Sequence, residues 1–363
     1  MNLFLSGKKL HDNLYRRFSY YNQLFVKSRQ LSTHMKAHGN IPKLTKSEKK
    51  ELISYWKQYG HKPNFKFARF MYNVSKIKDP RFLEEAVFYC KVNPVLCDFK
   101  LNMAWEDKNF YDIHFAGEPF PETIVHNIHG CFYDKKYRII NKEEAMQLIR
   151  QYDSVVIKPS LDTGGGKNVK LLRNFNFLEQ VLNEFGSDFI IQKVIKQHKT
   201  LEYLNDTSIN VFRLNTMRVD GEIISFKPYL RVIANDMEGV EKAGYGLNIG
   251  LDNQLVIGLD QNLKLMDKAF FYNGVATNRC LNGRQFEGMQ IPGCDLMIDL
   301  AKRLHKRLMY ADFASWDITI DENGEPVVIE LNLGNPGGLV YQYCYGPFLG
   351  EYTDSILKKT LHC

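Results

Sequence analysis

The chain has 363 residues, of which 44% are hydrophobic and 25% charged. This is the composition of an ordinary globular protein with room for two or three domains, and it excludes a collagen-like, coiled-coil or wholly disordered chain. The sequence has no run of about 18 apolar residues, so we expect no transmembrane helix. The apolar start of five residues is too short for a secretory signal, so we expect none, and the seven scattered cysteines form no CxxC pair. We therefore expect free thiols and a cytoplasmic protein.

The net charge of +7 is unevenly distributed. Residues 1–60 hold twelve Lys and Arg against three Asp and Glu. A basic segment of this kind attracts an anionic partner, and we expect a contact with an anionic glycan or with the inner face of a membrane. A solvated helical face is the alternative. The sequence contains no RRM, KH, zinc-finger or basic-zipper pattern, so we expect no nucleic-acid partner.

The first hundred residues predict helices. A helix over 8–37 is broken by the Gly39–Pro42 stretch, and Thr45 with Glu48 three residues later predicts a capped helix that runs to about Tyr59. More helix follows, with a break at 79–80. From residue 121 onward short strands replace helices. The expected elements are strands at 123–127 and 137–139, a helix at 143–151, alternating strands and loops from 154 to about 333, and a helix at 296–309.

The strongest local pattern is a hairpin. Asn323-Gly324 lies between two apolar runs, which is a strong signal for a two-residue β-turn. In that register Asp317 faces Glu330, and Asn332 lies on the same side of the sheet. The expected polar face carries Asp317, Thr319, Val328, Glu330 and Asn332. The expected buried face carries Trp316, Ile318, Ile320, Val327, Ile329, Leu331 and Leu333.

The two facing carboxylates of this hairpin suggest a metal site. They repel each other unless a cation lies between them. Two carboxylates and one amide are oxygen ligands of the kind that Mg²⁺ prefers, with Mn²⁺ as the alternative ion. The competing interpretation is a solvent-exposed sheet face whose acids lie in water. A slip in register by one residue would remove the facing pair.

A second group of residues suggests a phosphate site. An apolar strand over 155–160 carries Lys158 near its end, where a lysine needs an anion or an exit to water. Gly164, Gly165 and Gly166 follow in a loop between two strands, which could close over phosphates as a lid or form an ordinary mobile turn. The sequence matches neither the Walker A pattern nor GxGxxG.

Three more strands carry polar residues in apolar surroundings. The strand expected at 189–195 contains Gln192 and Lys193 and could present backbone groups to a purine edge. Arg213 and Arg231 each lie in a strand-like context. The planar guanidinium group suits phosphate or carboxylate, whereas an arginine on a strand edge could equally well lie in water.

In this order, the motifs resemble those of the ATP-grasp superfamily. The best match is the sugar-transfer-associated ATP-grasp family found with polysaccharide biosynthesis, over residues 105–345. The resemblance implies an α+β, ATP-grasp fold in which two α+β lobes grip ATP, preceded by a helical N-terminal region. The implied domains are a basic helical region at 1–104, a first lobe with the lysines and the glycine lid at 105–195, and a second lobe with the magnesium site and a C-terminal helix at 196–363.

The same resemblance implies roles for individual residues. Lys108 and Lys158 would bind the nucleotide phosphates, and Gly164, Gly165 and Gly166 would form the lid. Gln192, Lys193 and Val194 resemble the adenine hinge, and Glu202, with Asp206 as the alternative, resembles the ribose-binding acid. Arg213 and Arg231 would be catalytic, and Asp317, Glu330 and Asn332 would hold the metal. Asn335 and Gly337, in a loop of small residues, would admit the substrate or form a plain loop.

The implied activity is that of an ADP-forming carboxylate–amine ligase. A carboxylate attacks the γ-phosphate of ATP to give an acyl phosphate, and an amine then forms an amide. The implied carboxylate is a uronic acid of a capsule or other surface polysaccharide, and the implied amine is an amino acid. An ATP-grasp kinase that phosphorylates a sugar or small-molecule hydroxyl is the first alternative, and a non-catalytic binding protein is the second.

Overall fold

The computed structural model describes residues 2–161, 168–233 and 254–361. The chain divides into two compact units. Unit 1 comprises residues 1–99, 270–276 and 334–363, and unit 2 comprises residues 100–269 and 277–333. No helix in the described ranges is long and apolar enough to cross a bilayer.

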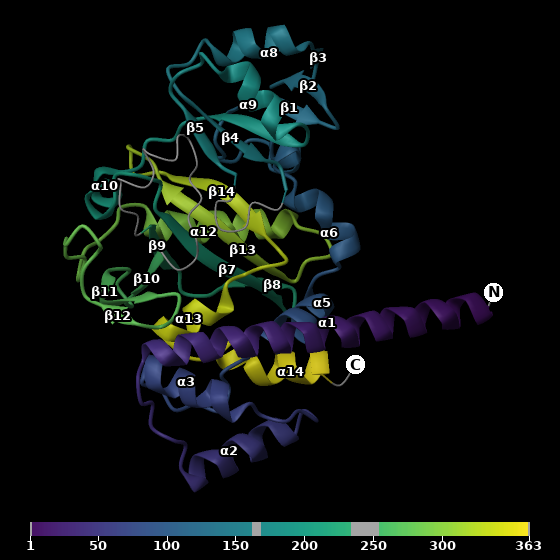
Figure 1. The fold of residues 1–363 in the computed structure, drawn as a ribbon, viewed down its shortest axis with the longest axis vertical. Coiled ribbons are helices and arrows are strands. Elements are labelled where there is room, and N and C mark those ends of the chain that lie inside the picture. The colour runs from purple at the N-terminus through teal and green to yellow at the C-terminus, as the bar shows by residue number, and fades with distance from the viewer. Residues whose placement is uncertain (1, 162–167, 234–253, 362–363) are drawn as a thin grey trace. The chain divides into compact units, whose positions relative to one another are not determined.

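Unit 1 is helical. Its first helix, α1 (Asn2–Ala37), has 36 residues and would measure about 54 Å, and Figure 1 shows it as one long rod. The other helices of unit 1 are α2 (Lys46–Lys57), α3 (Phe65–Ser75), α4 (Glu85–Val87), the π-helix η1 (Phe88–Val92), α5 (Asn93–Leu96), α13 (Gly338–Tyr345), the 3-10 helix η4 (Gly350–Tyr352) and α14 (Thr353–Leu361).

The start of α2 confirms the predicted cap. The Glu48 amide donates to the Thr45 hydroxyl at 3.2 Å, and the Thr45 amide donates to the Glu48 carboxylate at 2.7 Å. These reciprocal bonds satisfy two N–H groups that the first helical turn would leave unpaired. On the inner face of α2, Leu52 and Trp56 are buried. Trp56 also donates from its indole to the Pro80 carbonyl at 2.9 Å, which fixes the helix in unit 1.

Unit 2 contains two sheets and several helices. Helix α6 (Phe99–Glu106) begins at the boundary with unit 1, and the 3-10 helix η2 (Lys108–Phe110) and α7 (Tyr111–His114) follow it. The six-stranded sheet has the order β3-β2-β1-β6-β4-β5. Its strands are β1 (Thr123–Ile128), β2 (Cys131–Asp134), β3 (Ile139–Ile140), β4 (Val155–Pro159), β5 (Lys170–Leu172) and β6 (Phe189–Lys193).

Two helices cover the six-stranded sheet, as Figure 1 shows. These are α8 (Lys142–Ile149) and α9 (Leu178–Phe185), and both contribute to its hydrophobic core. The prediction that a strand begins at residue 137 is wrong. Tyr137 has φ +58°, a left-handed conformation that belongs to the turn between β2 and β3, so the strand begins only at Ile139. Strand β2 was not predicted.

The second sheet has eight strands in the order β12-β11-β10-β9-β7-β13-β14, with β8 paired to β7. Its strands are β7 (Val211–Val219), β8 (Glu222–Ser225), β9 (Tyr229–Ile233), β10 (Gln254–Leu259), β11 (Leu265–Phe271), β12 (Ala276–Thr277), β13 (Phe313–Ile320) and β14 (Pro326–Asn332). Helix α12 (Cys294–Arg307) packs against β7, β8, β13 and β14. The short helix α10 (Lys199–Leu204) follows the first sheet. All eight residues of β13 are buried, and this strand lies between β7 and β14.

The hairpin formed by β13 and β14 confirms one prediction and corrects two. Asp317 faces Glu330, as predicted. The two-residue turn is wrong, because the Asp321 amide bonds to the Glu325 carbonyl at 2.8 Å across a three-residue loop. The last loop residue, Gly324, has φ +87°, which suits a type I turn followed by a left-handed residue.

A β-bulge compensates for the longer loop. Ile318 faces Val328 while Asp317 faces Glu330, so Ile329 has no partner across the pair. The predicted positions of Val327 and Val328 are therefore wrong. Val328 lies opposite Ile318 on the apolar side, and Val327 lies opposite Thr319. The loop shifts the register by one residue and the bulge shifts it back, which leaves the two acids facing each other.

Candidate nucleotide and phosphate site

Three charged side chains form a row across the eight-stranded sheet. In the observed register Arg213 on β7 faces Asp317 on β13, and Asp317 faces Glu330 on β14. Residues that face each other on neighbouring strands point to the same side of a sheet. The opposite side of the same strands carries Trp316 and packs against α12, so the charged row lies on the side away from that helix.

Two arginines hold Asp317. Arg213 donates from Nε and Nη2 to the two carboxylate oxygens at 2.6 and 2.7 Å, a bidentate pair with both side chains buried. Arg231, on β9, donates from Nη1 to the same carboxylate at 3.3 Å. Arg231 is fixed in turn by the side-chain oxygen of Gln254, which accepts from its Nε at 3.1 Å and its Nη2 at 2.7 Å. Both predicted arginines therefore reach the predicted metal-binding acid.

The two arginines differ in their protonation energetics. Burial lowers the pKa of Arg213, but the adjacent Asp317 carboxylate more than offsets this and raises the pKa above its ordinary value. For Arg231, burial and then the positive charge of Arg213 lower the pKa. The charge of Arg213 is therefore well compensated, whereas the charged form of Arg231 is less favourable.

Lys108 connects the two sheets of unit 2. It lies in η2 and is 2% exposed. Its ammonium group lies 2.8 Å from the Glu330 carboxylate on β14, and it donates to the Ser160 carbonyl at 3.2 Å, just beyond β4. The Lys108 amide bonds to the same carbonyl at 3.1 Å. Backbone and side chain of one residue therefore fix η2 beside the end of β4.

Lys158 lies on β4, as predicted, and is 6% exposed. Its ammonium group donates to the carbonyl of the bulge residue Ile329 at 3.5 Å. Burial, followed by the positive charge of Lys108, lowers the pKa of Lys158 from 10.5 to about 7, against an opposing effect of Glu330. The lysine is therefore near its midpoint of protonation at neutral pH.

Four cations thus surround two carboxylates. Lys108 belongs to η2 and Lys158 to the first sheet, Arg213 and Arg231 belong to the second sheet, and all four are buried or nearly so. When Lys158 is protonated, positive charge exceeds negative charge by two within this set. A buried excess of positive charge is costly in an empty site and is compensated by a bound anion. The arrangement suits a polyphosphate.

The residues predicted to hold a metal fit a divalent ion by their chemistry. Asp317 and Glu330 face each other across the strand pair, and Asn332 lies two residues beyond Glu330 on the same strand. Across the described parts of the chain, no three or more His, Cys, Asp or Glu residues form a metal-binding group. The set of two carboxylates and one amide is an oxygen set that suits Mg²⁺ when phosphate supplies further ligands.

The residues predicted for the adenine hinge lie on and after β6. Gln192 is buried, and its side chain donates to the Pro121 carbonyl and to the Thr123 hydroxyl, both at 3.2 Å. Lys193 ends β6 with an exposed side chain, and Val194 follows the strand. The side chain of Gln192 therefore stabilises the join with β1 and leaves recognition of a base to backbone groups.

The remaining predicted residues fall into three groups. Glu202, in α10, and its alternative Asp206 are exposed. Gly164, Gly165 and Gly166 lie outside the described residues. Asn335 and Gly337 belong to unit 1, where Asn335 accepts a hydrogen bond from the Tyr89 hydroxyl at 2.8 Å.

Sequence reasoning missed several residues that support the site. Gln254 fixes Arg231, and Tyr111 accepts a hydrogen bond from the Leu331 amide at 3.0 Å and so braces β14 next to Glu330. Tyr111 is fully buried, and burial raises the pKa of its phenol well above the ordinary value, with a further contribution from Glu330. The sequence offered one clue to Tyr111, because it follows the predicted phosphate-binding Lys108 by three residues. It offered no clue to Gln254, the partner of Arg231.

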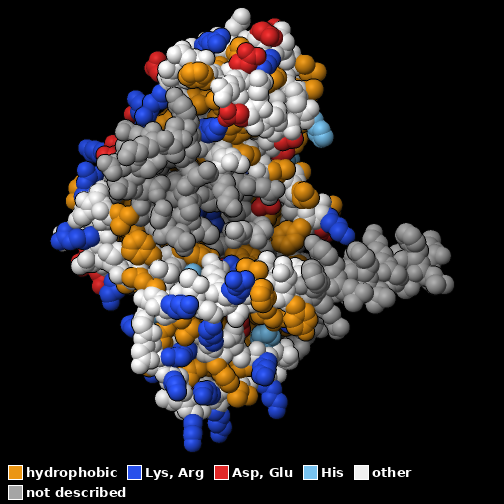
Figure 2. Space-filling view, viewed as in Figure 1, with side chains coloured by type: hydrophobic (Ala, Val, Ile, Leu, Met, Phe, Trp, Pro, Cys, Tyr) orange, Lys and Arg blue, Asp and Glu red, His pale blue; other side chains and the backbone are white. Residues whose placement is uncertain are grey.

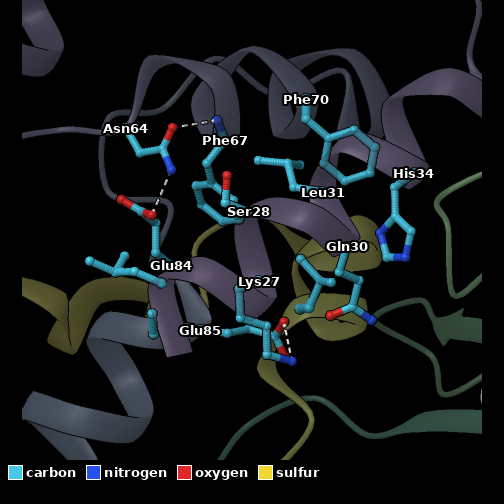
Figure 3. A pocket seen from close by; sticks show the side chains of 13 residues that line it. Lys27, Ser28, Gln30, Leu31, His34, Asn64, Phe67, Phe70, Glu84 and Glu85 are labelled. Carbon is cyan, nitrogen blue, oxygen red and sulfur yellow. Dashed lines mark hydrogen bonds and ion pairs between the residues drawn. The ribbon is translucent and has the colours of Figure 1, made fainter. Parts of the chain in front are cut away.

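Unit 1 contains a separate small cavity of about 40 Å³, and Figure 3 shows its lining. Lys27 and Glu85 form an ion pair of 3.0 Å in it, and Asn64 donates to Glu84 at 2.9 Å. Burial raises the pKa of Glu84 to about 7, against hydrogen bonds from Asn64 and the charge of Lys91. None of the predicted site residues lines this cavity.

With this geometry described, comparison with known proteins identifies the class. The family model described as sugar-transfer associated ATP-grasp matches residues 94–357, more than half of the chain. The chain is therefore an ATP-grasp protein with the α+β fold of that class. It belongs to the sugar-transfer associated ATP-grasp family, which confirms the resemblance drawn from the motifs. No curated protein sequence matches the chain.

Solved structures of ATP-grasp ligases show distant similarity. The VanG D-Ala:D-Ser ligase from Enterococcus faecalis is 14% identical, with a TM-score of 0.43 over 74% of this chain and 62% of that one. D-alanyl-alanine synthetase A from Vibrio cholerae is 10% identical, with a TM-score of 0.40 over 71% of this chain and 66% of that one. The ATP-grasp ligase PsnB, solved with Mg and ADP, is 13% identical, with a TM-score of 0.41 over 70% of this chain and 59% of that one. This chain thus spans less than two thirds of each of these chains.

Proposed function

We propose that this protein is an ATP-dependent, ADP-forming carboxylate–amine ligase that acts through an acyl phosphate. One observation carries the proposal: Lys108, Arg213 and Arg231 form ion pairs with the facing carboxylates Asp317 and Glu330 in unit 2, and the buried Lys158 lies beside Lys108 and Glu330. Family membership supports ATP as the anion that fills the site. The proposed reaction needs no nucleophilic side chain, because both reacting groups belong to the substrates.

Each cation has a role that follows from its position. Lys108 and Lys158, buried side by side next to Glu330, bind the α- and β-phosphates. Arg213 and Arg231 stabilise the negative charge that develops as the γ-phosphoryl group is transferred. Their bond to Asp317 fixes both guanidinium groups before ATP arrives, so little reorganisation is needed during the reaction. The resemblance assigns Gly164, Gly165 and Gly166 to the lid, and these residues lie outside the described ranges.

The proposed metal ligands are Asp317, Glu330 and Asn332, and the proposed ion is Mg²⁺, with Mn²⁺ as the alternative. When bound, the ion neutralises phosphate charge and orients the phosphates. Gln192, Lys193 and Val194 are proposed for the adenine edge and Glu202 for the ribose. Asn335 and Gly337 are proposed for the substrate.

The proposed substrates are a carboxylate sugar of the uronic acid class and an amine such as an amino acid, in the synthesis of a capsule or other surface polysaccharide. The description of the family as associated with sugar transfer supports a carbohydrate substrate. Asp317 and Glu330 would serve a kinase equally well, so the product decides between the two activities. A ligase releases phosphate only when carboxylate and amine are both present, whereas a kinase leaves phosphate on a hydroxyl.

The test is an assay of ADP and free phosphate with ATP, Mg²⁺ and a panel of uronic acids and amino acids. We expect phosphate release for particular pairs, and mass spectrometry should find the amide. Glu330→Gln should abolish release. Glu325→Gln, which changes an exposed acid of the same hairpin, is the matched control and should be unaffected.

Two results would contradict the proposal. Phosphate found on a sugar hydroxyl would establish the kinase. An unchanged melting temperature with ATP and Mg²⁺ would show that the cation cluster does not bind nucleotide, since a ligand that binds only the folded state must stabilise it.

We further propose that unit 1 contacts an anionic glycan or the inner membrane surface through a lysine face. This face comprises nine exposed lysines of α2, α3 and the adjoining loops: Lys43, Lys46, Lys49, Lys50, Lys57, Lys62, Lys66, Lys76 and Lys78. Figure 2 shows Lys and Arg side chains gathered over this part of the chain. Within the described residues, Lys78 is the one member of the face in an ion pair, with Glu48 at 2.8 Å.

The lysine face is tested by replacing four of its members. A variant with Lys46, Lys49, Lys50 and Lys57 changed to Gln should lose salt-dependent binding to vesicles with phosphatidylglycerol or to polygalacturonate. The control changes Lys136, Lys264, Lys268 and Lys306 of unit 2 to Gln, which removes the same charge from exposed positions elsewhere. At roughly 1 kcal/mol for each lysine near an anionic membrane, the first variant should bind vesicles several hundredfold more weakly. Equal losses in both variants would contradict a specific face.

A further inference from the structure

A second row of side chains lies beside the charged row. In the observed register Asn215 on β7 faces Ser315 on β13, and Ser315 faces Asn332 on β14. Each lies two positions along its strand from a member of the charged row, so the two rows are about 7 Å apart and share one side of the sheet.

This row is unusual because its polar atoms are buried without hydrogen-bond partners. The atoms concerned are both side-chain atoms of the Asn215 amide, the hydroxyl oxygen of Ser315 and the side-chain nitrogen of Asn332. Asn215 is 1% exposed and Ser315 is fully buried. Leaving such atoms unpaired costs free energy, and most buried polar groups in proteins find a partner. Three adjacent side chains with this defect indicate a place where a ligand supplies the missing partners.

The rest of the same strand shows that the defect is local. Thr319 lies two residues to the other side of Asp317, on the same face of β13, and it too is fully buried. Its hydroxyl donates to the Asn210 carbonyl at 2.9 Å. On β13 the hydroxyl on one side of the charged row is therefore unpaired and the hydroxyl on the other side is paired, although the side-chain oxygen of Asn210 is also buried without a partner.

The chemistry of the row specifies what it binds. Amides and a hydroxyl offer donors and acceptors but no charge, so the row suits neutral groups that can both donate and accept, such as hydroxyls. The three residues span two inter-strand spacings, about 10 Å, which is comparable to the width of a sugar ring with its hydroxyls. Carboxylate or phosphate would favour the neighbouring cations instead.

We propose that Asn215, Ser315 and the side-chain nitrogen of Asn332, whose side-chain oxygen is the proposed metal ligand, form a hydrogen-bonding subsite for the hydroxyls of the carbohydrate co-substrate. The subsite would hold the sugar ring next to the charged row, so that its carboxylate reaches the γ-phosphate. This inference rests on the proposed function for the identity of the reaction. The binding of a hydroxyl-bearing ligand by the row can be measured separately.

The test measures D-glucuronate binding by calorimetry, with and without a non-hydrolysable ATP analogue, together with kinetics for each uronic acid that the enzyme accepts. Ser315→Ala removes one unpaired atom. It should raise the sugar Kd and KM tenfold to a hundredfold while the KM for ATP stays unchanged, since one lost hydrogen bond to a ligand has about this effect. Thr319→Val is the matched control, because it removes a buried hydroxyl that already has a partner. It should lower the melting temperature and leave sugar binding unchanged.

The outcomes separate the two proposals. If Ser315→Ala leaves the sugar Kd and KM unchanged, or if the wild-type protein binds no uronic acid with or without nucleotide, the subsite is overturned and the row holds only water. If the wild-type protein binds glucuronate in a Ser315-dependent way but does not bind ATP, the subsite stands and the proposed ligase activity fails. A melting temperature of Ser315→Ala equal to or above that of the wild type excludes unfolding as the cause.

Discussion

Lys158 offers a prediction in which stability and binding change in opposite directions. Its pKa in the folded protein is about 7, against 10.5 for the ordinary side chain, because burial and Lys108 both disfavour the charged form. At about 1.4 kcal/mol for each pKa unit, the folded protein holds the charged lysine at a cost of about 5 kcal/mol. Lys158→Met removes this cost, and a buried charge replaced by an apolar side chain of similar size commonly stabilises by about 1–4 kcal/mol.

The pH dependence of this effect has a defined sign. Below pH 7 both the folded and the unfolded protein carry the charged lysine, so the full cost is present. Between pH 7 and 10.5 the folded protein has lost this proton while the unfolded chain retains it, and the cost disappears as the pH rises. The stabilisation by Lys158→Met should therefore be largest at pH 6 and small at pH 10. Urea unfolding at both pH values measures it, and Lys136→Met, at an exposed lysine, is the control.

Nucleotide binding should favour the charged form of Lys158, which burial in the folded protein disfavours. Phosphate next to Lys158 raises its pKa, so ATP binding at pH 8 should take up about 0.9 proton, because a group of pKa 7 is only about one tenth protonated there. Calorimetry in buffers of different ionisation enthalpy measures this uptake, and Lys158→Met should abolish both the uptake and the rise in melting temperature with ATP. If the substitution destabilises the protein equally at pH 6 and pH 10, Lys158 is not an uncompensated cation and the reasoning fails.

Three further predictions concern the frame of the site. Asp317→Asn leaves Arg213 buried without its carboxylate, so urea unfolding should show a loss of about 3–5 kcal/mol, partly restored by adding Arg213→Met; a loss below 1 kcal/mol would contradict the buried pair. Gly324→Ala forces a side chain into φ +87° and should cost about 1 kcal/mol, seen as a lower melting temperature, while an unchanged value would argue against the three-residue loop. Burial lowers the pKa of His305 to about 4, so its contribution to stability is present above pH 6.5 and is lost as the pH falls toward 4, by up to about 3 kcal/mol. His305→Gln should flatten that part of the pH–stability curve, and an unaltered slope would show that His305 does not cause it.

The sequence predicted the pairing of Asp317 with Glu330, but part of the reasoning was wrong. The expected turn is one residue shorter than the observed loop, and the bulge at Ile329 restores the register. Asn-Gly is a local signal, and it located the hairpin correctly. A bulge depends on what a strand packs against, here Lys158 at the Ile329 carbonyl, and local sequence does not contain that information.

The charged row illustrates a second limit. Arg213 and Asp317 are 104 residues apart in the chain, and they meet because β7 pairs with β13. The residue types predicted a phosphate site, and the family resemblance supplied their order. The partners that fix them, Gln254 for Arg231 and Ser160 for Lys108, have no pattern of their own. Non-local strand order therefore limits what could be predicted.

The contacts of Lys108 have a consequence for how unit 2 responds to its ligand. The Lys108 ammonium group contacts both the Ser160 carbonyl, which follows β4, and the Glu330 carboxylate on β14, so it links the two sheets. A nucleotide with a divalent ion competes for both ends, because phosphate attracts the ammonium and the ion attracts Glu330. Binding of nucleotide and ion would therefore break the link that Lys108 makes, and the spacing of the two sheets would depend on what is bound between them.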